Sequence, residues 1–384
     1  MRIAFYAPLK PPDHPVPSGD RLLARLFVAA LQHAGHDVVL ASRLRSYDGR
    51  GDRTRQRRLA ALGAGFAQRL IRRWQRDPAR APQLWFTYHL YHKAPDALGP
   101  IVSQVLGIPY VVAEASFAPK QQDGPWSEGH AAVEAALRAA DAVVCLNPQD
   151  VAMVEAVRDP AADLLVLPPF LDVDAFVAAG AADDASAAAA RLALPRDGPR
   201  LVTVAMMRPG DKLASYMLLA DALARLVQRP WHLVVVGDGA ARAEVEAAFA
   251  RLPRDRVQFL GAQPAGVVAA LLRSADLFAW PAVAEVLGLA MLEAQACGVP
   301  VVAGQRPGTT SMIEHGVTGC LVAPGDAGAF AAALAALLDD ADLRRRMGAH
   351  AAEHARTRHD LGCVAAPLGA LCARLVAARR RGLT

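Results

Sequence analysis

WPAVAEVLGLAMLEAQACGVPVVAG, residues 280–304, is an apolar stretch that contains only two charged side chains, Glu285 and Glu293. Residues 289–296 favour a helix, and the glycine and proline that follow favour its end before a buried strand over residues 299–303. The stretch therefore predicts a loop, a helix, a turn and a buried strand, in that order. Two carboxylates in such apolar surroundings call for a chemical reason.

Gly288 lies between the two acids and is expected to open the helix. The free amide groups and the positive dipole end of a helix suit a phosphate. Eight helical residues would span about 12 Å, which is comparable to the length of a nucleotide sugar. The spacing of Glu285 and Glu293 would therefore allow one acid to hold a sugar while the other holds a ribose.

The pattern E-x7-E followed by A-x-G-x-P-V-V-A resembles the donor-binding signature of the family-4 glycosyltransferases, retaining enzymes of GT-B fold. The resemblance implies that Glu285 contacts sugar hydroxyls, that Glu293 holds the ribose, and that Gly288 lets backbone amides approach the diphosphate. It also implicates the neighbouring Leu287 and Leu289. The family usually reads E-G-F-G-L where this chain reads E-V-L-G-L. A helix with one solvated and one capping glutamate is the structural alternative.

Composition points to two globular domains. A chain of 384 residues exceeds the size at which one core usually keeps growing, and 53% apolar with 21% charged residues is typical of globular proteins. No segment predicts a membrane span. The apolar stretch within the first ten residues is too short for a signal peptide. Five cysteines without a C-x-x-C pair favour a reducing cytoplasm and no zinc site.

The formal net charge is +5, and twelve arginines lie between Arg43 and Arg80. From Arg53 to Trp74 apolar residues recur at helical spacing, with arginines on most other faces. Such a helix is expected either to contact anionic lipid at the inner face of the membrane or to dock on its own domain with solvated arginines. No motif for nucleic-acid binding accompanies it.

The first residues predict a doubly wound parallel α/β domain, with a strand over residues 2–7, a helix over 21–34 and a strand over 36–42. The first loop has no G-x-G-x-x-G, which argues against an NAD-dependent or methyl-transfer enzyme. Family-4 enzymes usually have a glycine-rich loop here, near sugar and acceptor, and Gly19 matches it. A plain helix start capped by Ser18 explains the same residues equally well.

Two polar residues are expected at strand ends of this domain. His89 follows a strand over residues 84–88, where a histidine orients an acceptor or acts as a general base, or has only a structural role. Glu114 follows a strand over residues 108–113, within about a residue of the place where family-4 enzymes often carry a histidine. Glu114 would then contact sugar or acceptor in its place, or simply bond a nearby backbone group.

The second domain opens with a strand that ends near Arg208 and Lys212, which match the family pattern G-R-x-x-x-x-K-G in their two cations. Breaking the bond between sugar and phosphate leaves charge on the nucleotide diphosphate, which fixed cations stabilise. Gly237 lies in a turn that resembles the family's V-G-x-G. Gly261 lies in a loop that, by the resemblance, reaches the base through backbone contacts.

The resemblance implies two Rossmann-like domains facing across a cleft, residues 1–175 with a returning helix over 362–384, and residues 176–361. The expected reaction is retaining transfer of a hexosyl unit from a nucleotide sugar, with UDP as the guessed nucleotide and no metal or other cofactor. The acceptor stays open among lipid-linked glycans, polysaccharide precursors and small molecules. The alternative is a non-catalytic nucleotide-sugar-binding or partner subunit, which the missing histidine and Ser311 in place of a family glutamate would favour.

Overall fold

The computed structural model describes residues 1–16, 18–182, 187 and 198–382. The chain forms two compact units, Met1–Leu167 with Leu361–Thr384, and Pro168–Asp360. The first unit ends at Leu167 rather than after residue 175, because helix α6 (Val173–Ala181) packs against α10 (Ala265–Arg273) of the second unit. The alanine-rich composition of residues 178–190 predicts a surface helix or linker. This run begins in α6 and lies mostly outside the described residues.

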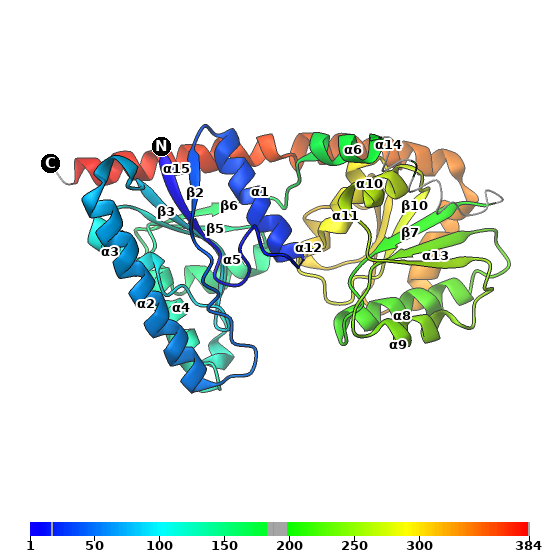
Figure 1. The fold of residues 1–384 in the computed structure, drawn as a ribbon. Coiled ribbons are helices and arrows are strands. Elements are labelled where there is room, and N and C mark those ends of the chain that lie inside the picture. Colours follow the sequence, from blue (N-terminus) through cyan, green and yellow to red (C-terminus); the bar gives the residue numbers. More distant parts are fainter. Residues whose placement is uncertain (17, 183–186, 188–197, 383–384) are drawn as a thin grey trace. The chain divides into compact units, whose positions relative to one another are not determined.

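The first unit is built on a six-stranded parallel sheet in the order β2-β1-β3-β4-β5-β6 (Figure 1). Its strands are β1 (Arg2–Tyr6), β2 (Asp37–Ser42), β3 (Leu84–Tyr91), β4 (Tyr110–Ser116), β5 (Ala142–Cys145) and β6 (Asp163–Val166). Its α-helices are α1 (Gly19–His33), α2 (Arg53–Arg76), α3 (Gly99–Leu106), α4 (Ser127–Ala139), α5 (Pro148–Glu155) and α15 (Leu361–Arg381). Short 3-10 turns lie at Pro78–Arg80 and Pro119–Gln121.

The last helix of the chain, α15, belongs to this first unit, where it packs on α1. By length and composition it is the one described helix that could cross a membrane. Eight of its side chains or glycines are nevertheless buried, and two of its arginines reach the sheet: Arg374 pairs with Asp163 at 2.8 Å and Arg379 with Asp141 at 2.6 Å. These contacts are those of a helix that completes a folded unit.

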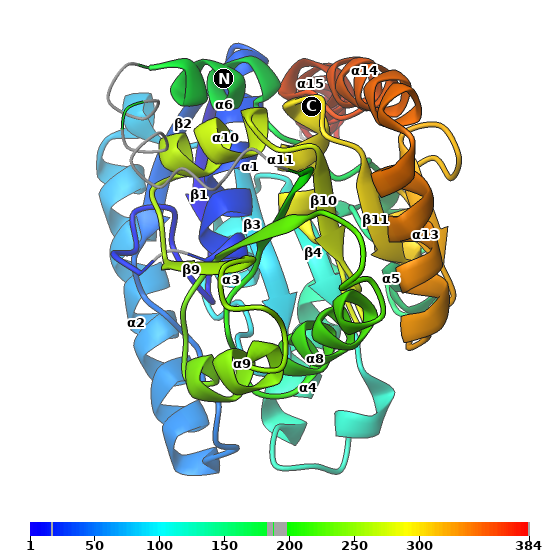
Figure 2. The ribbon, with the colours of Figure 1, turned by 90° about the vertical axis from the view of Figure 1, so that its right-hand side faces the viewer.

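The second unit repeats the plan with a parallel sheet in the order β12-β11-β10-β7-β8-β9. Its strands are β7 (Arg200–Val204), β8 (His232–Val236), β9 (Val257–Gly261), β10 (Leu277–Trp280), β11 (Val301–Gly304) and β12 (Gly319–Val322). Its further helices are α8 (Asp211–Ala224), α9 (Arg242–Phe249), α11 (Leu289–Ala296), α12 (Pro307–Thr310), α13 (Ala327–Asp339) and α14 (Ala341–Arg358). Figure 2 shows α8 and α9 on one side of this sheet and α10 and α11 on the other.

Strand order determines where each sheet is open to a ligand. In the first unit the chain winds from β1 outward to β2 on one side and through β3 on the other, and in the second unit β7 and β10 lie at the equivalent place. Loops that leave neighbouring strands at such a switch point diverge to opposite faces of the sheet. The carboxyl ends of β1 and β3, and of β7 and β10, are therefore the expected binding edges.

Candidate functional site

The proposed donor residues of the second unit gather at the carboxyl ends of β7, β8 and β10. Arg208 lies in the loop after β7, exposed, and no ion pair is formed by its guanidinium among the described residues. Lys212 lies in the first turn of α8, one helical turn further on. Two cations thus stand at the switch-point edge, as the sequence predicts for binding a diphosphate.

Lys212 is joined to the acid that the sequence assigns to the sugar. Its ammonium forms an ion pair with the Glu285 carboxylate and lies 5.3 Å from the centroid of the Trp280 ring. The indole Nε1–H of Trp280 donates to the same carboxylate oxygen at 3.0 Å. Glu285 is therefore held by two donors, one from the end of β10 and one from α8, before any ligand arrives.

Gly288 has a left-handed backbone, with φ of 53°, and opens α11. A Cβ added at this position would lie 2.2 Å from the Met291 Cε and 2.8 Å from the Glu285 Cγ. Only glycine fits both the backbone and the space. In the first turn of α11 the Met291 amide donates to the Gly288 carbonyl at 2.9 Å. The amides of Leu289 and Ala290 have no acceptor among the described residues and are available to an anion.

Glu293 lies in the second turn of α11, between the buried Leu292 and Ala294. No described residue forms a hydrogen bond or ion pair with its carboxylate, and burial raises its pKa to about 7. A desolvated carboxylate without a partner is costly, and a ligand hydroxyl would satisfy it. Leu287, which is partly buried, and the buried Leu289 flank the start of the same helix.

The two glycine turns predicted from sequence lie beside the loop that carries Arg208. The Gly237 amide donates to the Gly261 carbonyl at 2.8 Å, so the ends of β8 and β9 are joined there. A Cβ at Gly237 would lie 1.8 Å from the Ala205 carbonyl oxygen at the end of β7. Glycine therefore permits the close approach of two backbones at this edge.

In the first unit, His89 lies within β3 and Glu114 within β4, each with a left-handed backbone. His89 Nδ1 is 3.1 Å from the Asp20 carboxylate, which comes from the first turn of α1. The Glu114 carboxylate accepts a hydrogen bond from the Leu146 amide at the end of β5. Burial raises the pKa of Glu114 to about 7.

Gly19 is the first residue of α1, and nothing lies within 4 Å of a Cβ added there. The Ser18 hydroxyl caps the helix by accepting from the Arg21 amide at 3.2 Å. The local geometry is that of an ordinary capped helix start, so it does not require glycine at this position.

The basic helix α2 uses its apolar stripe for packing. Gly63, Ala67, Ile71 and Trp74 are buried in the first unit, where α2 lies against α3. Its arginines remain outside, and Leu62 is its large exposed apolar side chain, at 44%. What α2 offers to a partner is therefore positive charge rather than an apolar face.

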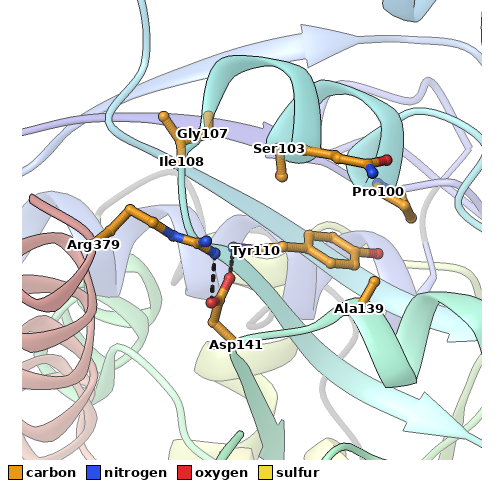
Figure 3. Close-up of a pocket in the computed structure, with 9 residues that line it drawn as sticks. Pro100, Ser103, Gly107, Ile108, Tyr110, Ala139, Asp141 and Arg379 are labelled. Carbon is orange, nitrogen blue, oxygen red and sulfur yellow. Dashed lines mark hydrogen bonds and ion pairs between the residues drawn. The ribbon is translucent and has the colours of Figure 1, made fainter. Parts of the chain in front are cut away.

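A pocket of about 360 Å³ lies at the opposite, amino edge of the first sheet, between α3, α4 and α15 (Figure 3). In Figure 3 the Arg379 guanidinium reaches Asp141 at the start of β5, and the Tyr110 amide donates to the same carboxylate at 2.8 Å. The charged groups of this pocket pair with each other. Because the pocket is remote from the carboxyl edge, it is separate from both predicted clusters.

Three residues around these clusters were not singled out from sequence as site residues. Trp280 holds Glu285, Asp20 holds His89, and Ala282, with φ of 51°, is strained next to the end of β10. The contact between Asp20 and His89 joins residues 69 positions apart, so no local pattern in the sequence reveals it. Across the described ranges, no three His, Cys, Asp or Glu side chains gather as they would around a metal ion.

Residues 190–354 match the family model described as "Glycosyl transferases group 1". Among curated proteins, the chain is 35% identical over 214 residues to the D-inositol 3-phosphate glycosyltransferase of Thermobispora bispora. The aligned region covers 53% of this chain and 49% of that protein. The chain is 45% identical over 102 residues to the protein of the same name from Corynebacterium glutamicum, covering 27% and 24%. The chain spans less than half the length of the curated relatives it matches.

Solved structures match over nearly the whole chain. The sucrose-phosphate synthase of Thermosynechococcus elongatus gives a TM-score of 0.73 at 22% identity, covering 98% of this chain and all of that one. HepE of Anabaena, solved in complex with UDP, gives 0.73 at 18% identity, covering 97% and 100%. At such identities the likeness concerns the fold alone, and it confirms the expected two-domain Rossmann-like GT-B fold.

Proposed function

We propose that this chain, whose residues 190–354 match the group 1 glycosyltransferase family model, transfers a hexosyl unit from a nucleotide sugar to a hydroxyl-bearing acceptor with retention of configuration. One observation carries the proposal. At a single sheet edge, the held acid Glu285 and the unpartnered acid Glu293 stand on either side of the glycine that opens α11. A nucleotide sugar has a sugar, a diphosphate and a ribose in the matching order.

The chemistry asked of this edge is stabilisation of a leaving group. As the bond between the sugar and the phosphate breaks, negative charge develops on the nucleotide diphosphate. Arg208, Lys212 and the amides that open α11 are fixed positive groups at that edge, and such groups stabilise the charge without reorganising. We assign no nucleophile, and the nucleotide sugar is proposed as a co-substrate with no further cofactor or metal.

The donor is proposed to be a UDP-sugar. HepE has been solved with UDP and with UDP-glucose, and the Burkholderia xenovorans trehalose-phosphate synthase is described as UDP-forming. The nucleotide named for these proteins of similar fold supports the choice of UDP. For the acceptor we propose binding in the first unit, from a cytoplasmic pool or from the inner face of the membrane, where the arginines of α2 would meet anionic lipid.

Calorimetric titration with UDP, GDP and ADP tests the proposal. UDP is expected to bind, and Glu293→Ala and Arg208→Ala are each expected to weaken it about tenfold or more, as loss of a charged hydrogen bond does. Glu244→Ala on α9 and Arg225→Ala at the far end of α8 are matched controls and should bind like the native protein. Absence of binding to all three nucleotides would contradict the proposal and favour a non-catalytic subunit.

A further inference from the structure

Two adjoining strands of the first unit are strained at the same level. Among the residues described, three non-glycine residues have a left-handed backbone, and two of them are His89 in β3 and Glu114 in β4, with φ of 63° and 55°. Tyr88 pairs with Ala113 and Leu90 with Ala115, so the strained residues lie side by side. Glutamate seldom adopts this conformation, and such strain clusters at functional sites.

The strain shifts the alternation of both strands. Trp85 of β3 and Val112 of β4 lie in the core cluster beneath α2, α3 and α4, so a regular strand would also direct residues 89 and 114 into that core. Instead Leu90 and Ala115 occupy the cluster. The side chains of His89 and Glu114 are therefore left out of the core and lie at the carboxyl edge of the sheet.

His89 is oriented by a partner. Its Nδ1 is 3.1 Å from the Asp20 carboxylate, and its side chain is 26% exposed. When the ring is neutral, a proton on Nδ1 is donated to Asp20, which leaves the Nε2 lone pair as a hydrogen-bond acceptor. No described residue forms a hydrogen bond with Nε2. His89 lies at the switch point of the sheet, where β3 neighbours β1.

Glu114 is suited to the complementary role. One carboxylate oxygen accepts from the Leu146 amide. Burial is the main cause that raises the pKa of Glu114 to about 7. The charge of Asp150 acts in the same direction, whereas the Leu146 and Asn147 amides and His89 act against it. A carboxyl group that keeps its proton near neutral pH donates a hydrogen bond as well as accepting one.

We propose that His89, held by Asp20, and Glu114 form a binding site for adjacent hydroxyl groups of a polyol or sugar ring. His89 Nε2 accepts from one hydroxyl, and Glu114 donates to its neighbour. This inference rests on the proposed function and specifies its acceptor side. The carboxylates of Asp20 and Asp150 would repel an anion, so a phosphate on the acceptor lies outside this site.

Histidine-ring NMR on the ¹⁵N-labelled full chain tests the site, with myo-inositol and glucose as probes. The His89 Nε2 signal is expected to shift saturably with one of them. His92, three residues further on and packed with its ring 5.7 Å from that of Trp126, is the internal control and should not shift. The absence of a saturable His89 shift with either probe, or an equal shift at His92, would overturn the proposal.

Variants separate binding from folding. Glycine adopts the left-handed backbone without strain, so Glu114→Gly is expected to lose about tenfold in polyol affinity, the effect of one hydrogen bond. Glu114→Gln keeps a donor and is expected to retain affinity, which guards against a purely structural loss. Asp20→Ala removes the acceptor of the His89 Nδ1–H and should weaken binding by releasing the ring. Unchanged affinity in Glu114→Gly would overturn the inference.

The same samples are titrated with UDP. If UDP binds while polyols leave His89 unaffected, this inference fails and the proposed function stands. If no nucleotide binds, the proposed function fails whatever His89 does.

Discussion

A partly buried, desolvated carboxylate destabilises the fold once it is ionised. Glu293, which has no partner among the described residues, is in this position. Its pKa, raised to about 7 from 4.5, means that the native state holds a proton that the unfolded chain releases. Stability attributable to this residue is therefore fully present below pH 4.5 and falls as pH rises through 7. In the proposed function, a ribose hydroxyl would supply the hydrogen bond that this desolvated carboxylate lacks.

Glu293→Gln should therefore be more stable than the native protein above pH 7, by up to about 2 kcal/mol after allowing for its partial contact with solvent. The difference should shrink toward pH 4.5. Urea unfolding across this range measures it, and Glu244→Gln on exposed α9 is the control, expected to change little at any pH. A stability difference independent of pH would contradict the account.

Comparing Gly288→Ala with Gly325→Ala tests whether the start of α11 contacts the nucleotide. A methyl group at Gly288 meets Met291 and Glu285, whereas at Gly325, with φ of 81°, nothing lies within 4 Å. Both substitutions should cost about 1–2 kcal/mol through strain. Only Gly288→Ala should also weaken UDP binding, measured by calorimetry. Equal nucleotide affinity in both variants would argue that the α11 opening does not touch the ligand.

Site residues can be predicted from the sequence when they lie close together in a single segment. Glu285, Gly288 and Glu293 follow from spacing within a single loop and helix, and the structure places them at one edge. The ion pair between Lys212 and Glu285 joins residues 73 positions apart, so no local pattern reveals it. Their roles in binding stay predictions, which the nucleotide titrations address.

Elements are predicted where periodicity is strong. Helix α11 covers residues 289–296 as expected, and the strands fall close to their expected places because buried parallel strands read as short apolar runs. Periodicity does not reveal what covers an apolar face. The stripe of α2 fits a lipid surface and a protein core equally well, and only the structure shows that Ala67, Ile71 and Trp74 are packed.

The packing of α15 on α1 depends on Gly369. A Cβ there would lie 2.7 Å from the Ala34 Cβ. Gly369→Val should therefore destabilise the protein by about 1–3 kcal/mol through overpacking, as measured by thermal unfolding. Ala373→Val on the exposed face of the same helix is the matched control and should stay within about 0.5 kcal/mol of the native value. Similar effects of both would mean that the helix does not pack closely there.

For the whole molecule, the resemblance predicts two Rossmann-like domains and a last helix that returns to the first, and the structure has both features. The boundary between the two units differs from the predicted one, because the packing of α6 on α10 is a tertiary contact that composition does not signal.

The positive charge of the chain is unevenly distributed. Helix α2 carries eight arginines and no acid, so with a total of +5 the rest of the chain sums to −3.

This division predicts electrostatic binding to anionic vesicles through α2. Changing Arg58, Arg69, Arg72 and Arg73 together to glutamine should weaken binding on the order of a hundredfold or more, because each arginine near an anionic surface contributes about 1 kcal/mol. Vesicle flotation with and without phosphatidylserine measures it, and binding should fall as salt rises.

The matched control removes four exposed arginines elsewhere, Arg345, Arg346, Arg356 and Arg358 of α14. Both variants have the same net charge, so a difference between them reports position rather than total charge. We expect the α14 variant to retain most vesicle binding. Equal loss in the two variants would mean that total charge alone drives binding, and binding that ignores phosphatidylserine would exclude the electrostatic mechanism. Either result would leave the arginines of α2 as a solvated face of the first unit.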